Sequence, residues 1–407
     1  MEKKSFKLGL LPKILIAIVV GILIGQFLPV WFCRIIVTAS GIFSTFLKFI
    51  IPLMIVAYVT MGIADLKSGA GKLLLITVAL AYTSTLIFGS ASYLVASSLF
   101  PHFMSEGAME QIAATAGVSL DSYLSITIPP LLDTLSAVVL AFVLGLCLSM
   151  LRGKTISNTL YECMKDFSGI IDKVLHAVII PLLPLYICGT FVDMTKSGKT
   201  FAILSVLWKV FLVVILMHLI CICIQFVVAG AISHKNPVQL IRNQIPGYAT
   251  AIGTQSSAAT IPVNKEACDN IGVPKDVSDL VLPMGCTMHM DGSVLSSIVK
   301  IAFLYGVFGK DFVGAETYAM AIVVAILSAF VLSGAPGGGL VGEMLIVSMF
   351  NFPAEAFPII ATLGFIFDPA ATCLNSSGDT IASMLVTRLV EGKEWLTKRI
   401  ASGEVEA

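Results

Sequence analysis

The sequence predicts an all-α membrane protein with eight transmembrane helices and two re-entrant hairpins. Of its 407 residues, 57% are hydrophobic and only 12% are charged, about half of the ~25% found in an average soluble domain. Long uncharged apolar runs recur along the chain, as membrane-spanning helices require. In the second half, polar and acidic residues interrupt apolar segments, where a helix that faced lipid could not carry them.

The charge balance excludes other classes of protein. Lys and Arg together number 25, and Asp and Glu together also number 25, so the net charge is zero. A nucleic-acid-binding protein usually carries a basic patch, and a disordered chain has low hydrophobicity. We therefore expect membrane lipid around this chain and no nucleic-acid partner.

Six spans are predicted in the first part of the chain. The first apolar run is long and lacks a clear cleavage site, which favours a retained span over a cleaved signal peptide. Lys and Arg gather before it and in the loops at 65–72 and 152–173, whereas the 101–123 loop has none. This asymmetry places the N-terminus in the cytoplasm. The six spans cover residues 14–33, 35–64, 73–99, 131–151, 174–192 and 201–233.

The second half contains two segments that do not resemble full spans. Residues 243–275 are too polar to face lipid, and 317–342 contain a glycine-rich run. Irregular backbone at membrane depth is tolerated only against protein or a wet cavity, so each segment is predicted to enter the membrane and return. Residues 280–299 and 355–390 complete the eight spans. With this count the basic C-terminal residues lie inside, so both termini are predicted to be cytoplasmic.

An internal repeat organises this half. In residues 243–300 a polar hairpin precedes a helix in which Asp291 comes before a glycine. In residues 317–390 a glycine-tipped hairpin precedes a helix in which Asp379 follows a glycine. The two hairpins would enter from opposite sides. Inverted repeats with broken helices at the membrane midplane are how many secondary transporters build their binding site.

A polar stripe on the last span is the first candidate site. Asp368, Thr372, Asn375 and Asp379 are spaced by 4, 3 and 4 residues, so they share one helical face. Such a face must meet protein or water. It suits a cation, or an ammonium group together with a cation, because hard cations take oxygen ligands. The alternative is structural hydrogen bonding between helices.

The second candidate site surrounds Asp291. Thr287, His289, Asp291 and Ser293 alternate, so they share no helical face, and a proline and two glycines surround them. We predict a locally unwound helix whose free carbonyl groups bind an ion. His289 has two alternatives: it could carry a proton near neutral pH, or it could be an ordinary core residue.

Three further features have a functional and a plain interpretation. The tip 255–260 offers serine hydroxyls and a helix N-terminus that would attract a carboxylate, or it is an ordinary loop. The glycine run at 334–339 is a mobile gate or a flexible linker, and it is no phosphate loop because no Gly-Lys-Ser/Thr follows. Lys300 is expected to extend to a membrane interface.

These motifs together resemble the dicarboxylate/amino acid:cation symporter family, the glutamate-transporter homologues. The resemblance covers essentially the whole chain, including residues 46–54 of the second span, and is most specific in the second half. The matching motifs there are Ser256-Ser257 with Ile261-Pro262-Val263, Leu282-Pro283-Met284-Gly285 with Met290-Asp291-Gly292, Gly334-Ala335-Pro336-Gly337 with Gly339, and Asp368 through Asp379.

The resemblance implies a homotrimer with an elevator mechanism. Each protomer would have a scaffold, made of spans 1 and 2 in residues 1–70 and spans 4 and 5 in residues 124–200. The transport domain would contain span 3, with the external loop, in residues 71–123, and a core in residues 201–407. Both hairpins would belong to this moving domain, with the glycine-rich one as the gate.

The resemblance also implies roles for individual residues. Asp368 and Asn375 would hold the ammonium group of the substrate, Ser257 its α-carboxylate, and Thr372 would line the side-chain pocket. The implied substrate-binding set is Ser256, Ser257, Met290, Ser293, Ala335, Gly339, Asp368, Ala371, Thr372 and Asn375. The implied cation-binding set, where Na⁺ would bind, is Thr83, Ser84, Gly285, Thr287, His289, Asp291, Asn375 and Asp379.

Departures from the family pattern affect the expected substrate and ion. Ala371 and Gln255 stand at positions where the family frequently has an Arg. In members that carry acidic substrates, the Arg at the position of Ala371 pairs with the distal carboxylate of the substrate through two hydrogen bonds. His289 stands where the ion site usually has Asn. Ala329 and Leu332 replace hydroxyl residues that usually help to bind sodium. A neutral amino acid is therefore favoured, and the coupling ion is Na⁺, H⁺ or both.

We expect a cation-coupled secondary symporter of a small neutral amino acid in the cytoplasmic membrane, with no cofactor and no enzymatic activity. A symporter of dicarboxylates or other organic anions is the alternative within the transporter class. A channel is a further possibility. An intramembrane aspartyl protease, with Asp291 and Asp379 as its dyad, is the remote alternative from the enzyme class.

Overall fold

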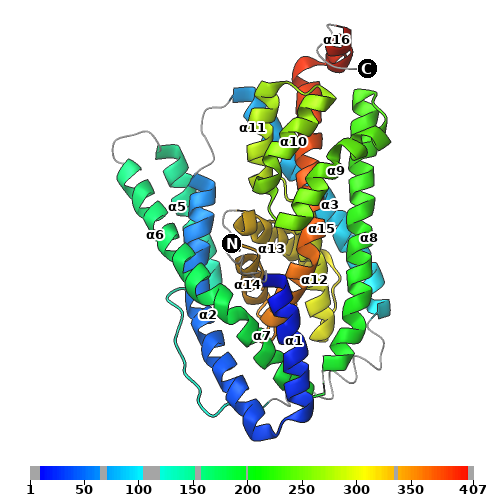
Figure 1. Cartoon of the computed structure of the whole chain (residues 1–407). Coiled ribbons are helices and arrows are strands. Elements are labelled where there is room, and N and C mark those ends of the chain that lie inside the picture. The colour runs from blue at the N-terminus through cyan, green and yellow to red at the C-terminus, as the bar shows by residue number, and fades with distance from the viewer. Residues whose placement is uncertain are drawn as a thin grey trace, which may run out of the picture.

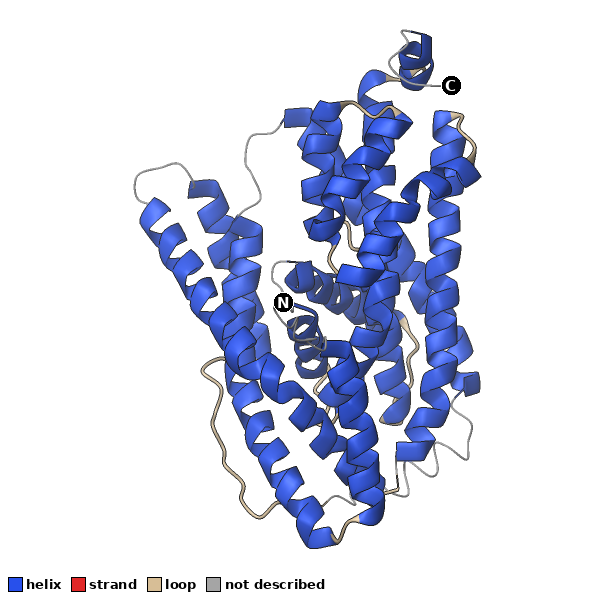
Figure 2. Ribbon diagram, viewed as in Figure 1, coloured by secondary structure: helices blue, strands red, loops and turns tan. Residues whose placement is uncertain are grey.

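The computed structural model describes residues 10–64, 71–103, 120–151, 157–198, 200–333 and 338–401. Within these ranges the regular secondary structure is helical and contains no strand (Figure 2). Six of these helices are long and apolar enough to cross a membrane, and four shorter apolar helices accompany them. These findings confirm the all-α membrane class. The count of eight spans and the elevator arrangement stay predictions.

One group of helices surrounds α2 (Figure 1). Helix α1 packs along α7, and α2 packs along α5, α6 and α7. Helices α1 and α5 are apolar on every side, as expected for helices that meet both protein and lipid. The bounds in this group are α1 (Leu10–Phe27), α2 (Val30–Ala64), α5 (Thr134–Leu151), α6 (Ser157–Val174) and α7 (Ile180–Lys196).

The segment at 152–173, predicted to be a loop, is mostly helix. Helix α6 is amphipathic and continues through a π-helical turn, η1 (Leu175–Ile179), into α7. Its side chains Glu162 and Lys165 are exposed and lie 3.8 Å apart, whereas Ile171 is buried. The prediction was wrong because a search for long apolar runs does not detect an amphipathic helix. The span predicted at 174–192 is therefore the end of a longer helix.

A second group of helices surrounds α15. Helix α15 packs against α8, α9, α10, α11, α12 and α14, and α3 packs along α12. Helix α12 is almost entirely buried, from Asp291 to Leu304. The bounds in this group are α3 (Gly71–Phe103), α8 (Thr200–Ser233), α9 (Pro237–Thr254), α10 (Ser257–Ile271), α11 (Lys275–Met288), α12 (Asp291–Val307), α13 (Ala315–Ser333), α14 (Gly338–Met349), α15 (Ala356–Glu391) and the terminal α16 (Trp395–Ala401).

Both predicted hairpins contain two helices that pack against each other. Helices α9 and α10 meet at Gln255, whose φ of 52° lies in the left-handed region and reverses the chain. Ser256 caps α10, because its side chain accepts a hydrogen bond from the backbone N–H of Ala259 at 3.3 Å. Helices α13 and α14 form the second pair. Its tip, residues 334–337 with Ala335, lies outside the described residues.

The predicted helix break before Asp291 is present. Helix α11 ends at Met288, and α12 begins at Asp291. The two residues between them leave helical geometry, with φ and ψ of −95° and 85° at His289 and −115° and 43° at Met290. The break presents the N-terminus of α12 and the C-terminus of α11 to α15, which remains one continuous helix.

Candidate functional site

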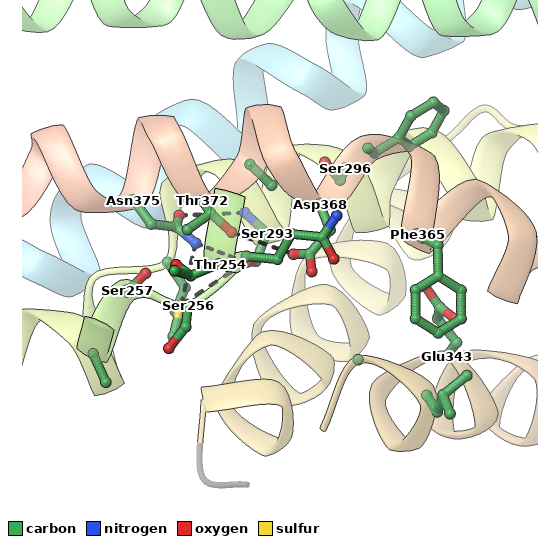
Figure 3. Close-up of a pocket in the computed structure, with 18 of the residues that line it drawn as sticks. Thr254, Ser256, Ser257, Ser293, Ser296, Glu343, Phe365, Asp368, Thr372 and Asn375 are labelled. Carbon is green, nitrogen blue, oxygen red and sulfur yellow. Dashed lines mark hydrogen bonds between the residues drawn. The ribbon is translucent and has the colours of Figure 1, made fainter. Parts of the chain in front are cut away.

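A cavity of about 600 Å³ lies where the first hairpin tip meets the broken helix, α14 and α15 (Figure 3). The hairpin tip contributes Ser256 and Ser257 to its wall. Helix α15 contributes Asp368, Thr372 and Asn375 from one face, as the spacing of the polar stripe predicts. Asp379, one helical turn beyond Asn375, continues this face into the protein interior, where it is 1% exposed.

Asp368 is the acidic end of the stripe at the cavity. Its Oδ1 accepts a hydrogen bond of 3.4 Å from the hydroxyl of Thr372, one turn along the same helix. The carboxylate is partly buried and faces the same space as Ser256 and Ser257 (Figure 3). A carboxylate in such a place favours a cationic group, and an ammonium group is the chemical match.

Asn375 joins α15 to the broken helix. Its side-chain oxygen accepts hydrogen bonds from the backbone N–H groups of Gly292, at 2.8 Å, and Ser293, at 3.4 Å. Its amide nitrogen donates to the hydroxyl of Ser293 at 2.9 Å and contacts the sulfur of Met290 at 3.5 Å. Asn375 thus satisfies two of the free N–H groups that begin α12.

The first hairpin is fixed to α15 by a buried polar network. Asn264 accepts a hydrogen bond from the side chain of Gln244 at 2.7 Å. Its own amide donates to Ser376, reaching the carbonyl at 3.0 Å and the hydroxyl at 2.9 Å. This network holds the N-terminus of α10 at the cavity, where the positive end of the helix dipole favours an anion such as a carboxylate.

The carboxylate of Asp291 has partners from two helices and from the helix break. Ser84 and Thr85 of α3 donate to it at 2.5 and 3.0 Å, and Gln225 of α8 donates at 2.8 Å. His289 completes the shell, with its Nε2 3.1 Å from Oδ2. The carboxylate is fully buried. These partners satisfy the charge as buried ions require.

His289 lies between the two aspartates of the inverted repeats. Its Nδ1 is 3.4 Å from Oδ1 of Asp379, and its Nε2 faces Asp291. Gly378 makes room for the ring, because a Cβ at that position would come within 2.5 Å of the imidazole carbon Cε1. Apart from this imidazole contact, Oδ1 of Asp379 has no hydrogen-bond partner among the described residues. A buried carboxylate oxygen with so few partners is a place for a cation.

The donor set around Asp379 suits Na⁺ better than a transition metal. In the described part of the chain, no group of three or more His, Cys, Asp or Glu side chains is placed to hold a metal ion. Gly285 lies directly against the Asp379 carboxylate in the last turn of α11. Its carbonyl accepts the backbone N–H of His289, and the carbonyls that follow it are past the last bond of this helix. Carboxylate and carbonyl oxygens are the ligands of hard cations.

The structure brings most predicted site residues together, with differences in detail. Thr83, which was predicted to bind the cation together with Ser84, is exposed, and Thr85 lies beside Ser84 at Asp291 instead. Thr287 faces the cavity, and its hydroxyl bonds the carbonyl of Met284 rather than the aspartates. Ala335 lies outside the described residues. The other predicted residues that line the cavity are Met290, Ser293, Gly339 and Ala371.

Some residues of the site were missed. Gln225 is a single amide within a long apolar helix, which is a signal of a buried partner. The prediction that Lys300 extends to a membrane interface is wrong. Its ammonium group is buried at the cavity, 3.0 Å from the carboxylate of Glu343. The available signal of a buried ion pair was Glu343, a single acidic residue inside the apolar second arm of the second hairpin.

Asp291 and Asp379 are not arranged as an aspartyl-protease dyad. Such a dyad needs two carboxylates that share one proton at close range. The imidazole of His289 lies between Asp291 and Asp379, and hydroxyl and amide donors occupy the other side of Asp291.

Comparison with known proteins gives one consistent result. A family model described as the sodium:dicarboxylate symporter family matches residues 10–389. Three relatives, each named serine/threonine transporter SstT, come from Acinetobacter baumannii strains AYE, AB307-0294 and AB0057. Each is 28% identical over 402 residues, an alignment that covers 93% of this chain and 96% of the relative.

Proposed function

The chain belongs to the sodium:dicarboxylate symporter family, so it is an integral membrane symporter coupled to a cation, and we propose that it carries a small neutral amino acid of the serine type. Membership in a family of symporters confirms the expectation of a transporter rather than an enzyme. The observation that carries the proposed substrate class is Asp368 at a cavity whose one lysine, among its described lining residues, is already paired.

The proposed substrate pose uses three features of the cavity. The ammonium group binds Asp368. The α-carboxylate binds at the N-terminus of α10, beside Ser256 and Ser257, where the helix dipole favours negative charge. The side chain points toward Thr372 and Ala371, a small polar-edged space that suits a hydroxyl group. The names of the three relatives support serine and threonine as first candidates.

A dicarboxylate fits the cavity less well, despite the family description. A second carboxylate needs a cationic partner, because burying it unpaired costs several kcal/mol. Ala371 supplies no charge, and the ammonium of Lys300 is bound to Glu343. Asp368 would in addition repel a substrate without an amino group.

We propose that the coupling ion binds around Asp379, close to Gly285 and the end of α11. Asn375 links this region to the substrate cavity. It belongs to α15, which also carries Asp368, and its side chain accepts a hydrogen bond from the backbone at the start of α12. Binding of the cation at Asp379 therefore orders the amino-acid site, and binding of the amino acid orders the cation site. Each of the two ligands raises the affinity of the protein for the other. His289 makes two couplings conceivable: Na⁺ beside the histidine, or a proton on it.

The remaining architecture is proposed from the family resemblance and the packing. The helices around α2 would form a stationary scaffold, and those around α15 a moving transport domain. Mutual packing within each group supports this division. We further propose a homotrimer in the cytoplasmic membrane, with both termini on the cytoplasmic side.

Uptake into proteoliposomes tests the proposed function. Purified protein is reconstituted, and radiolabelled L-serine uptake is measured under an imposed inward sodium gradient or an imposed proton gradient. Serine accumulation driven by sodium supports a Na⁺ site at Asp379. Accumulation driven only by protons assigns the coupling to His289. No gradient-driven uptake of serine, threonine or any other neutral amino acid would contradict the proposal.

A further inference from the structure

We propose that the Lys300–Glu343 ion pair is a specificity determinant: Glu343 neutralises the one lysine among the described lining residues of the cavity, so that an acidic substrate finds no free cation there. This inference rests on the proposed amino-acid symport, and it adds two residues to which the family resemblance gives no role. The pair joins α12 to α14, the second arm of the glycine-rich hairpin.

The geometry shows that the pair belongs to the cavity and that it is fully formed. The Lys300 Nζ and Glu343 Oε1 atoms are 3.0 Å apart, and the two side chains are 4% and 3% exposed. Both residues line the same cavity as Asp368, and Lys300 is close enough to Asp368 to interact with it electrostatically.

Helix α15 is shaped to receive the Glu343 carboxylate. Gly364 lies one helical turn before Asp368, and a Cβ there would collide with the carboxylate of Glu343. The absence of a side chain at this position lets the acidic group reach Lys300 between two helices. The Glu343 carboxylate therefore lies in a space formed by α12 and α15, although Glu343 itself belongs to the second hairpin.

The charges of the cavity explain why this arrangement selects against acidic substrates. The charged residues among the described lining are Lys300, Glu343 and Asp368. The first two neutralise each other, which leaves the Asp368 charge for the ammonium of the substrate. An aspartate substrate would bring a further carboxylate into a cavity that already holds Asp368 and Glu343, with no free cation among the described lining residues to receive it. Such like-charge contact and unpaired burial discriminate strongly between ligands.

The pair could alternatively serve only to hold the hairpin arm against α12. The two roles differ in what the single variants do. A purely structural pair predicts that removal of either charge lowers all transport without changing the order of preferred substrates. A specificity determinant predicts that removal of each charge admits substrates whose side chains carry that same charge.

The test compares substrates in competition with radiolabelled L-serine uptake by reconstituted protein. L-Asparagine and L-aspartate have the same shape and differ in charge, so the wild type should be inhibited by asparagine and much less by aspartate. In Glu343→Gln, the free lysine should strengthen inhibition by aspartate about tenfold relative to asparagine. In Lys300→Gln, the free glutamate should instead strengthen inhibition by L-2,3-diaminopropionate by about the same factor.

Two controls complete the design. Glu316→Gln makes the same chemical change at an exposed position in the first turn of α13, and it should leave the substrate order unchanged. The double variant Lys300→Gln/Glu343→Gln removes both charges, so the aspartate gain of Glu343→Gln should disappear in it.

Several results would overturn the inference. One is equal inhibition of the wild type by aspartate and asparagine. Another is a Glu343→Gln variant that takes up serine but is inhibited by aspartate no more strongly than the wild type. The third is stronger inhibition by aspartate that persists in the double variant. The wild-type comparison and the reciprocal Lys300→Gln variant decide the matter if Glu343→Gln does not fold. Failure of the wild type to take up any neutral amino acid would instead remove the proposed function, and this inference with it.

Discussion

Asp368 has the most direct role at the scale of single residues. Asp368→Asn keeps the shape and the hydrogen bond partner Thr372 but removes the charge that receives an ammonium group. Because loss of one partner from a buried charge pair costs about 2–5 kcal/mol, we expect an affinity for serine lower by about 30-fold or more. The measurement is serine-dependent thermal stabilisation of the purified protein, together with uptake.

The control for this prediction is Asp311→Asn, the same change at an exposed position between α12 and α13. It should bind serine like the wild type. Undiminished serine binding by Asp368→Asn would show that the ammonium group is held elsewhere in the cavity.

His289 allows a second prediction at this scale. The ring contacts both Asp291 and Asp379, and it stands where the family usually has Asn. His289→Asn removes the only basic group between these carboxylates in the described structure. The carboxylates then need another cation, so we expect the sodium concentration for half-maximal serine uptake to fall by about tenfold. His102→Asn, an exposed change, should leave it unchanged.

The outcome of His289→Asn separates the two coupling schemes. A sodium response identical to that of the wild type would mean that the imidazole does not compete with a cation. Loss of uptake driven by a proton gradient, with no gain for sodium, would assign the proton to His289 itself.

At the scale of elements, the attachment of the first hairpin to α15 is the feature to test. Asn264 bonds Gln244 on the other arm and Ser376 on α15. Asn264→Leu has a similar volume and leaves these buried polar groups without a partner, which costs about 2–4 kcal/mol. We expect a fall of several degrees in apparent melting temperature and weaker serine binding.

Asn270→Leu serves as the control for this change, since Asn270 is an exposed residue near the end of the same helix. It should alter the melting temperature by about a degree or less. If Asn264→Leu melts and binds serine like the wild type, the network does not position the hairpin tip.

The elements that could be predicted are those with a strong local signal. The polar stripe from Asp368 to Asp379 follows from helical periodicity alone, and the break before Asp291 follows from the proline and glycines around it. Helix α6 was missed because its charged face hides its apolar face from a search for uninterrupted runs. The Lys300–Glu343 pair was missed because its partners are 43 residues apart on different helices. Glu343 inside an apolar segment signals a buried partner, but one sequence does not identify Lys300 as that partner.

At the scale of the whole molecule, the residues by themselves indicate apolar and polar segments but not how these group, and the predicted grouping came only from the family resemblance. The register of α3 illustrates this limit. Thr83, Ser84 and Thr85 are chemically similar, and only the packing of α3 against α12 selects the last two as partners of Asp291. Likewise, the sharing of contacts within the helices around α2, and within those around α15, becomes visible only in three dimensions.

The proposed motion between these two groups leads to the last prediction. Gly62 of α2 lies against the ring of Phe330 of α13, with 2.9 Å between a Cβ built at Gly62 and the ring carbon Cε1. If the group around α15 moves past the group around α2, a bridge between these positions must stop transport. We expect Hg²⁺ to abolish serine uptake by the double variant Gly62→Cys/Phe330→Cys, and dithiothreitol to restore it.

Serine binding should survive in the bridged protein, because Ser257, Asp368 and Thr372, which are proposed to hold serine, all lie in the moving group and away from the bridge. Each single-cysteine variant, with the native cysteines still present, controls for the effect of Hg²⁺ itself and should keep its uptake. Full uptake by a protein in which bridging is demonstrated would show that the two helix groups need not move relative to each other. Transport would then have to proceed by local opening of the hairpins alone, around a site that stays at one depth in the membrane.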